Sequence, residues 1–289
     1  MAQKLTVVVT GSTGKQGGAV ARGLLERGHK VRAVTRDPNS SQAKLLANAG
    51  AALVVASLED TAAITKALEG ATSLFADDGA VRRYGRRDTT GCRVGRCSQG
   101  SWRASRLHFR RLRQPTDGRS ALRQQVRGRK THCQSRRRAT ILAPVAFMEN
   151  LYFIKEQLAT GVYASALSPT RALAQVAVPD IGAVAIRVLE DSARFTGKRF
   201  DLAGDELTGN EAMAILSRVI GRSFSYFQVP LDVVRQRMGE DAVKMYEWFD
   251  RVGFAVDRAA LRREFSDVDF QNFESWAKAQ DWNALLQSA

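Results

Sequence analysis

The amino-terminal segment of residues 4–37 is the feature that most restricts how this chain can fold. It opens with the β-branched run KLTVVVT, typical of a strand buried on both faces of a parallel sheet. A glycine-rich turn follows, then KQGGAVARGLLERG with helical apolar spacing, and then the strand-like run HKVRAVTRD. Gly28 is placed to stop the helix. This order of strand, turn, helix and strand predicts a doubly wound parallel sheet.

The turn carries glycines in the spacing G-x-x-G-x-x-G, and each has a physical reason to be glycine. Gly11 allows a tight turn off the strand, and Gly14 lets the backbone approach a pyrophosphate. Gly17 allows close packing of the helix, whose N-terminus then faces the phosphates. The turn therefore predicts dinucleotide binding, with a purely structural turn as the alternative.

The end of the second strand predicts which dinucleotide is preferred. A site for NAD usually has an acidic residue there for the ribose 2′-hydroxyl, whereas an arginine suits the 2′-phosphate of NADP. Arg36 stands about twenty residues after the turn, at the distance expected for this contact. NADP(H) is therefore the predicted cofactor, with NAD as the second choice. The alternative is a solvated Arg36 paired with Asp37.

The pattern continues with a strand at 51–56, a helix at about 59–69 and a strand at 72–76. Ser57 or Asp60 is expected to cap the helix. Ser57 and Leu58 fall at the end of the third strand, where an adenine ring usually rests, although Leu58 fits the core equally well. We also assign Phe75, in the fourth strand, to the cofactor site.

Residues 77–138 differ from the rest of the chain in composition. This window holds 19 of the 44 lysines and arginines, only 4 of the 29 aspartates and glutamates, and all three cysteines. The remainder has 25 residues of each sign, so the net charge of +15 belongs to this window alone. Only seven of its 62 residues are Val, Leu, Ile, Met or Phe, so we expect irregular structure and no central strand.

Three interpretations of this window compete. An arginine-rich arm for nucleic acid is one. A metal site is another, with the candidate ligands Cys92, Cys97, His108, His132 and Cys133. The window contains no C-x-x-C pair, which makes this interpretation a poor one. The favoured interpretation is a frame-shifted translation, because a one-base shift permits apolar strand and helix sequences, including SKYEVEKHIASLGV. A well-packed apolar strand from residues 104–112 would contradict it.

The carboxyl-terminal third begins with ATILAPVAFMENLYFIKEQLATG, which reads as strand, loop and helix. Tyr152 and Phe153 are expected in the core. Asp180 is expected to cap a helix at 180–190, and TGNE at 208–211 has the spacing of a capping box. The aromatic tail predicts a small helical substrate lobe.

Several of these pieces together resemble the NmrA-like branch of the atypical short-chain dehydrogenases. They are TGSTGKQGGAVARGLL, VRAVTRDP, ASLEDTAAITKALEGATSLF, ATILAPVAFMENL, VAVPDIGAVAIRVLED and GKRFDLAGDELTGNEAMAILSRVIGR. The resemblance covers about 1–76 and 139–225. It implies a phosphate turn made by Gly11, Thr13, Gly14, Lys15, Gln16 and Gly17, with Arg36 on the 2′-phosphate. Phe147 and Asn150 would line the nicotinamide and substrate end, and Ser57 replaces a residue that is often acidic in the family.

These observations predict an α/β protein with a Rossmann cofactor domain at 1–150 and a substrate lobe at 151–289, some of whose segments return to the Rossmann core. The expected function is NAD(P)H-dependent reduction of a quinone-like or carbonyl substrate, with a non-catalytic redox sensor as the alternative. The expected partner is accordingly a small-molecule electron acceptor or a regulatory protein, and nucleic acid is not expected. The catalytic residues, the substrate and the oligomeric state are not predicted. Without a signal peptide or a spanning run of about 18–20 apolar residues, a cytoplasmic location is expected.

Overall fold

The computed structural model describes residues 4–77, 105–109 and 139–287 of the chain. These residues form two compact units, one made of 4–77, 105–109, 139–143 and 181–200, the other of 144–180 and 201–287. The division at residue 150 into a cofactor domain and a substrate lobe stays a prediction. In chain order, the elements are β1 (Thr6–Val9), α1 (Lys15–Glu26), β2 (Lys30–Thr35), α2 (Ser41–Asn48), β3 (Ala52–Val55), α3 (Thr61–Leu68), β4 (Ser73–Asp77), β5 (Ser105–Phe109), β6 (Ala139–Pro144), β7 (Ala146–Phe147), η2 (Met148–Ile154), α6 (Lys155–Ala159), β8 (Val162–Ser165), β9 (Leu173–Val176), α7 (Val178–Glu190), α8 (Ser192–Phe195), β10 (Arg199–Leu202), β11 (Asp205–Leu207), α9 (Gly209–Ile220), β12 (Ser225–Gln228), α10 (Leu231–Met238), α11 (Glu240–Arg251), α12 (Arg258–Glu264), α13 (Phe273–Lys278) and α14 (Trp282–Gln287).

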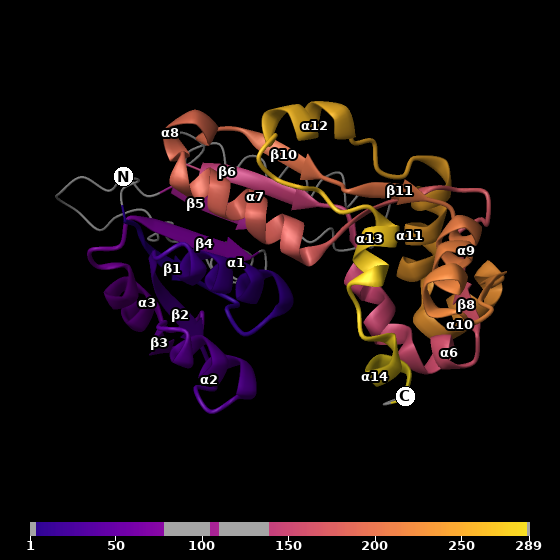
Figure 1. Ribbon diagram of the computed structural model, residues 1–289, viewed down its shortest axis with the longest axis horizontal. Helices are drawn as coiled ribbons and strands as arrows, with labels where there is room; N and C mark the ends of the chain where they lie inside the picture. The colour runs from indigo at the N-terminus through magenta and orange to yellow at the C-terminus, as the bar shows by residue number, and fades with distance from the viewer. Residues whose placement is uncertain (1–3, 78–104, 110–138, 288–289) are drawn as a thin grey trace. The chain divides into compact units, whose positions relative to one another are not determined.

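The first unit is built on a seven-stranded sheet with the order β10-β6-β5-β4-β1-β2-β3 (Figure 1). Strand β1 pairs in parallel with β2 on one side and with β4 on the other. The chain order reverses at β1, and in open α/β sheets ligands bind outside the carboxyl ends of the strands at such a reversal. The predicted doubly wound parallel sheet is confirmed, and its geometry places the glycine turn at this point.

Strand β1 is buried on both faces, as its β-branched sequence predicts. Val7, Val8 and Val9 have no exposed surface. Val8 belongs to an apolar cluster with Ile64 and Ala67 of α3, and neighbouring side chains on a strand point to opposite faces. Helix α3 therefore covers one face of the sheet.

Helix α1 packs closely against the part of α7 that belongs to the first unit. A Cβ atom built on Gly23 would lie 2.5 Å from Cδ1 of Ile186, and one on Gly182 would lie 3.1 Å from Cβ of Ala19. Both distances are shorter than ordinary van der Waals contacts, so the two glycines let these helices approach one another.

The structure corrects the expectation that residues 77–138 supply no central strand. Residues 105–109 form β5, which lies between β4 and β6 and pairs in parallel with both. Backbone hydrogen bonds to two neighbours do not depend on side-chain type, so the polar composition did not prevent pairing. The strand reads SRLHF and lies within the 104–112 segment named above, but the burial of its side chains lies outside what the structure describes, so this test of the frameshift stays open. Every other residue of the window from 78 onwards lies outside the described ranges, as do all the candidate metal ligands except His108.

The second unit contains a three-stranded sheet, β11-β9-β7, a two-stranded sheet, β12-β8, and most of the carboxyl-terminal helices. Trp276 belongs to an apolar cluster of this unit, with its ring stacked 6.0 Å from that of Tyr152 and packed against Phe273 and Trp282. The prediction for Tyr152 is therefore confirmed. The prediction for Phe153 is wrong, because its side chain is 69% exposed.

Two helix starts can be compared with the sequence predictions. The capping box is confirmed, since Thr208 accepts from the Glu211 backbone N–H and the Glu211 carboxylate accepts from the Thr208 N–H. Asp180 does not cap its helix, because α7 already begins at Val178. Its carboxylate instead accepts two hydrogen bonds from Gln271, both 3.0 Å long.

Over the described ranges, no helix has the length and apolar character needed to cross a membrane. Within the same ranges, no group of three His, Cys, Asp or Glu side chains is arranged to hold a metal ion.

Candidate cofactor-binding site

The glycine turn after β1 has the backbone geometry that its spacing predicts. Gly11 adopts φ 61°, in the left-handed region that favours glycine, and its carbonyl accepts a 2.9 Å hydrogen bond from the Gly14 N–H. A Cβ on Gly17 would lie 2.3 Å from the Gly11 carbonyl oxygen and 2.8 Å from that of Thr10. No side chain fits there, so Gly17 is required for the first turn of α1 to pack on the strand.

The N-terminus of α1 is open to an anion. Gly14 is its N-cap residue and supplies no side-chain cap, and the first turn contains no acidic residue. Gly14 and Lys15 are both exposed. The first N–H groups of a helix carry partial positive charge and no partner within the helix, so this end can receive a phosphate.

Gln16 adds a second sign of a missing ligand at this helix end. Its Oε1 atom is buried and accepts no hydrogen bond from any described residue. A buried polar atom without a partner costs free energy unless a ligand or water satisfies it. The open helix end and the glycine cradle fit the pyrophosphate portion of a dinucleotide, whereas the Gln16 oxygen is an acceptor and needs a donor such as a ribose hydroxyl.

A buried hydrogen bond connects the turn to the second strand. The Ser12 hydroxyl donates to the Val34 carbonyl at 2.9 Å, and Ser12 is 1% exposed. This bond fixes the turn beside the end of β2, where Thr35 and Arg36 follow. The phosphate turn and the predicted 2′-phosphate residue are therefore neighbours.

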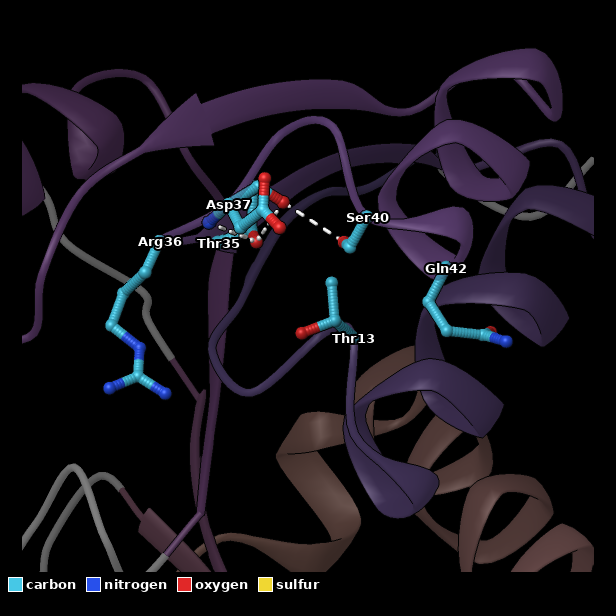
Figure 2. A pocket seen from close by; sticks show the side chains of 6 residues that line it. All are labelled: Thr13, Thr35, Arg36, Asp37, Ser40 and Gln42. Atoms are coloured by element: carbon cyan, nitrogen blue, oxygen red, sulfur yellow. Dashed lines mark hydrogen bonds between the residues drawn. The ribbon is translucent and has the colours of Figure 1, made fainter.

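The end of β2 opens into a polar pocket of about 240 Å³, shown in Figure 2. Figure 2 shows Thr13, from the glycine turn, between Arg36 and Gln42, with Ser40 and Asp37 above it. The residues lining the pocket are Thr13, Thr35, Arg36, Asp37, Ser40 and Gln42.

The Arg36 guanidinium does not pair with Asp37. Arg36 is exposed and has no ion pair or hydrogen bond to any residue that the structure describes. The Asp37 carboxylate instead accepts a 2.9 Å hydrogen bond from the Asn39 N–H. The structure therefore contradicts the alternative in which Arg36 pairs with Asp37, and the Arg36 guanidinium is available for a ligand.

Of the remaining predicted cofactor residues, Ser57 and Leu58 follow the end of β3 and Phe75 lies in the middle of β4. Ser57 accepts from the Glu59 N–H at 3.2 Å, and Asp60, not Ser57, caps α3. Leu58 packs against the apolar cluster beneath α3, which agrees with its core alternative. Phe75 has no exposed surface, and its carbonyl accepts from the Thr10 N–H at 3.0 Å. Their roles at a cofactor stay predictions.

The predicted substrate residues belong to the second unit. Phe147 ends β7 and is half-buried, and Asn150 is exposed on η2. Between them, Glu149 is 6% exposed and accepts hydrogen bonds from the Val178 N–H at 3.0 Å and the Trp276 indole N–H at 3.1 Å. Sequence reasoning missed Glu149, whose role is to anchor the helix that carries Asn150.

Tyr152 is the tyrosine nearest to these residues in sequence. Burial, helped by the nearby Glu149 carboxylate, raises its pKa to about 12. Tyr152 therefore remains a protonated phenol at neutral pH and cannot serve there as a general base. Tyr84 and Lys130, which are not expected to act in proton transfer, lie outside the described residues.

Sequence reasoning found Thr13 and Arg36 but missed the rest of the pocket. Ser40 and Gln42 come from the loop after β2 and the first turn of α2, where no motif marks them. The only available signal was position, because Ser40 precedes the helical run at 41–48 as a capping residue should.

A family model described as "NmrA-like family" matches residues 3–86 and 122–277. Among curated proteins, the NmrA-like family domain-containing oxidoreductase hkm9 of Aspergillus hancockii is 40% identical over 84 residues, 27% of this chain and 25% of that protein. The corresponding protein notA of Aspergillus sp. (strain MF297-2) is 58% identical over 50 residues, 17% of this chain and 15% of that protein. The matches thus span a quarter or less of these relatives.

Solved structures match over nearly the whole chain. NmrA, a negative transcriptional regulator in complex with NADP, has a TM-score of 0.68 at 17% identity, covering 97% of this chain and 99% of that one. The NADPH-dependent quinone oxidoreductase QOR2 of Escherichia coli has a TM-score of 0.68 at 21% identity, covering 94% and 98%. At these identities the likeness concerns the fold.

Proposed function

Because the chain belongs to the NmrA-like family, we propose that its first unit binds NADP(H) and that the protein is an NAD(P)H-dependent oxidoreductase. The proposed substrate is quinone-like or a carbonyl compound. Two similarities support this: the curated relatives are named oxidoreductases, and the structurally similar QOR2 is an NADPH-dependent quinone oxidoreductase.

The single observation that carries the cofactor proposal is the arrangement of Arg36 beside the phosphate turn. Its unpaired guanidinium lines one pocket with Thr13, while the open N-terminus of α1 lies at the other end of the same turn. An arginine placed in this way suits the 2′-phosphate that distinguishes NADP from NAD. We propose NADP(H) as the preferred cofactor and NAD(H) as a weaker ligand, since related structures hold NADP, NAD or NADPH.

In this proposal the bound cofactor supplies a hydride for reduction of the substrate. Gly14 and the first N–H groups of α1 hold the pyrophosphate, and Arg36 binds the 2′-phosphate. The buried Gln16 amide oxygen is an acceptor, so its partner would be a hydroxyl group of the cofactor and not the pyrophosphate. Phe147 and Asn150 are proposed as contacts for the substrate and the nicotinamide end. No catalytic residue is proposed.

A non-catalytic redox sensor, acting through a regulatory protein, is the second candidate. It is favoured by one observation, the structural similarity to NmrA, which is a negative transcriptional regulator. Titrating the chain with NADPH and NADH, then measuring NADPH consumption over a panel of quinones and carbonyl compounds, separates the candidates. Turnover identifies an oxidoreductase, tight binding without turnover identifies a sensor, and absence of NADPH binding contradicts both.

We further propose that residues 77–138 are a frame-shifted translation of a family segment. The family model leaves residues 87–121 unmatched, although it matches 77–86 and 122–138, so this gap supports the proposal only for the middle of the window. The proposal assigns the basic charge to the shifted reading frame, so nucleic acid is not proposed as a partner. A cytoplasmic location stays a prediction.

A further inference from the structure

The six side chains of the pocket at the end of β2 fall into two groups. Thr35, Asp37 and Ser40 are hydrogen-bonded to their own loop. Thr13, Arg36 and Gln42 make no hydrogen bond or ion pair with any residue of the described ranges. The first group is structural, and the second has its hydrogen-bonding capacity available for a ligand.

The structural group fixes the backbone of the loop. The Asp37 carbonyl accepts hydrogen bonds from the Thr35 and Ser40 hydroxyls, both 3.0 Å long, and Thr35 is only 5% exposed. The Asp37 carboxylate accepts from the Asn39 N–H. Asp37 is thus held by both its backbone and its side chain, and it forms part of the pocket wall.

The charged side chains of the pocket do not by themselves satisfy a phosphate, so its neutral hydrogen-bond donors are needed as well. Arg36 is the single cation among the lining residues, and the Asp37 carboxylate offsets it. A phosphate group carries close to two negative charges at neutral pH, so one offset guanidinium does not satisfy it. Additional donors are needed, and Thr13 and Gln42 are the lining side chains whose donors have no partner.

We infer that Thr13 and Gln42, beside Arg36, are selectivity contacts for a 2′-phosphorylated ribose, and that Gln42 must be uncharged for this ligand to bind. The inference rests on the proposed cofactor. The Gln42 amide donates through Nε2, and the Thr13 hydroxyl donates through Oγ1. Gln42 and Arg36 are both exposed side chains at opposite sides of Thr13, so each can move to meet the ligand between them (Figure 2).

The test measures binding of 2′,5′-ADP, which carries the 2′-phosphate, and of 5′-AMP, which lacks it, by calorimetry. Gln42→Glu turns a neutral donor into a carboxylate beside the phosphate and should weaken 2′,5′-ADP binding ten-fold or more, with 5′-AMP changed less than two-fold. Gln42→Met and Thr13→Val each remove one donor at similar size and should weaken 2′,5′-ADP binding several-fold. NADPH and NADH should follow the same pattern.

Asn48→Asp is the matched control, because it adds the same charge at the exposed far end of α2. It should change 2′,5′-ADP binding less than two-fold, and thermal unfolding of each variant shows that it is folded. The inference is wrong, and the cofactor proposal stands, if two results are found together. Gln42→Glu and Gln42→Met both bind 2′,5′-ADP as tightly as the control does, and Arg36→Ala still binds it more weakly. If the unsubstituted chain binds neither dinucleotide, the cofactor proposal itself is wrong.

Discussion

Arg36 is the residue proposed to select the cofactor, and its removal gives the first prediction. A charge-assisted hydrogen bond to a phosphate is worth about 1.5–3 kcal/mol. Arg36→Ala should therefore weaken NADPH binding about ten-fold or more and leave NADH binding nearly unchanged, as measured by fluorescence titration. Lys30→Ala, which removes a charge from the exposed start of the same strand, should alter neither affinity. Equal losses for NADPH and NADH in Arg36→Ala would contradict the assignment.

Asp180 gives a prediction about pH that does not depend on any cofactor. Burial, with smaller effects from the Glu149 and Asp269 charges, raises its pKa from 3.8 to about 6, although two hydrogen bonds from Gln271 oppose the rise. The folded state then binds this proton more tightly than the unfolded state does. The stability contributed by Asp180 is complete below about pH 4 and is lost as the pH rises through 6.

The measurement for Asp180 is urea unfolding of the parent chain and of Asp180→Asn between pH 4 and 7. The parent's free energy of unfolding minus that of the variant should decrease across this range by on the order of 2 kcal/mol. Taking the difference removes the pH dependence of groups that both proteins share. A difference that is flat or that increases with pH would show that Asp180 is not the titrating group.

The turn between β1 and α1 tests whether its glycines serve folding or binding. Gly17→Ala puts a methyl group 2.3 Å from the Gly11 carbonyl, so we expect a loss of about 1–3 kcal/mol in the free energy of unfolding. Gly14→Ala has 3.2 Å of space and an ordinary φ of −86°, so its loss of stability should be smaller. If Gly14 faces the pyrophosphate, Gly14→Ala should still weaken NADPH binding several-fold. Unfolding and NADPH titration of both variants separate the two effects, and equal stability losses would contradict the comparison.

Elements with a strong local pattern could be predicted from the sequence, and elements that depend on distant partners could not. The β1–α1–β2 unit and the capping box at Thr208 are local, and both were predicted. Strand β5 was not, because its place between β4 and β6 comes from backbone pairing with segments far away in sequence. Asp180 looked like a helix cap because its true partner, Gln271, lies 91 residues later.

The same distinction applies to the candidate site. Gly11, Gly17 and Arg36 were found because a backbone conformation, a close approach and a charge leave a mark in the sequence. Gln42 joins the pocket only because α2 folds back beside the glycine turn, and a neutral exposed residue gives no such mark. The buried anchor Glu149 was missed because its partners, Val178 and Trp276, are far away in the chain.

At the scale of the whole molecule, the charge distribution gives the last prediction. Residues outside 77–138 carry equal numbers of basic and acidic side chains, so the net charge of +15 is confined to one window. If that window is frame-shifted, resequencing the gene should find one base lost or gained near the codon for Asp77 and a compensating change near that for Arg138. The chain with the frame restored should lose most of its basic charge, unfold cooperatively on heating and bind NADPH more tightly than the chain with the present sequence.

If sequencing confirms the present reading frame, the arginine-rich arm becomes the explanation of the window. DNA binding should then weaken steeply with added salt, because each phosphate contact releases counterions.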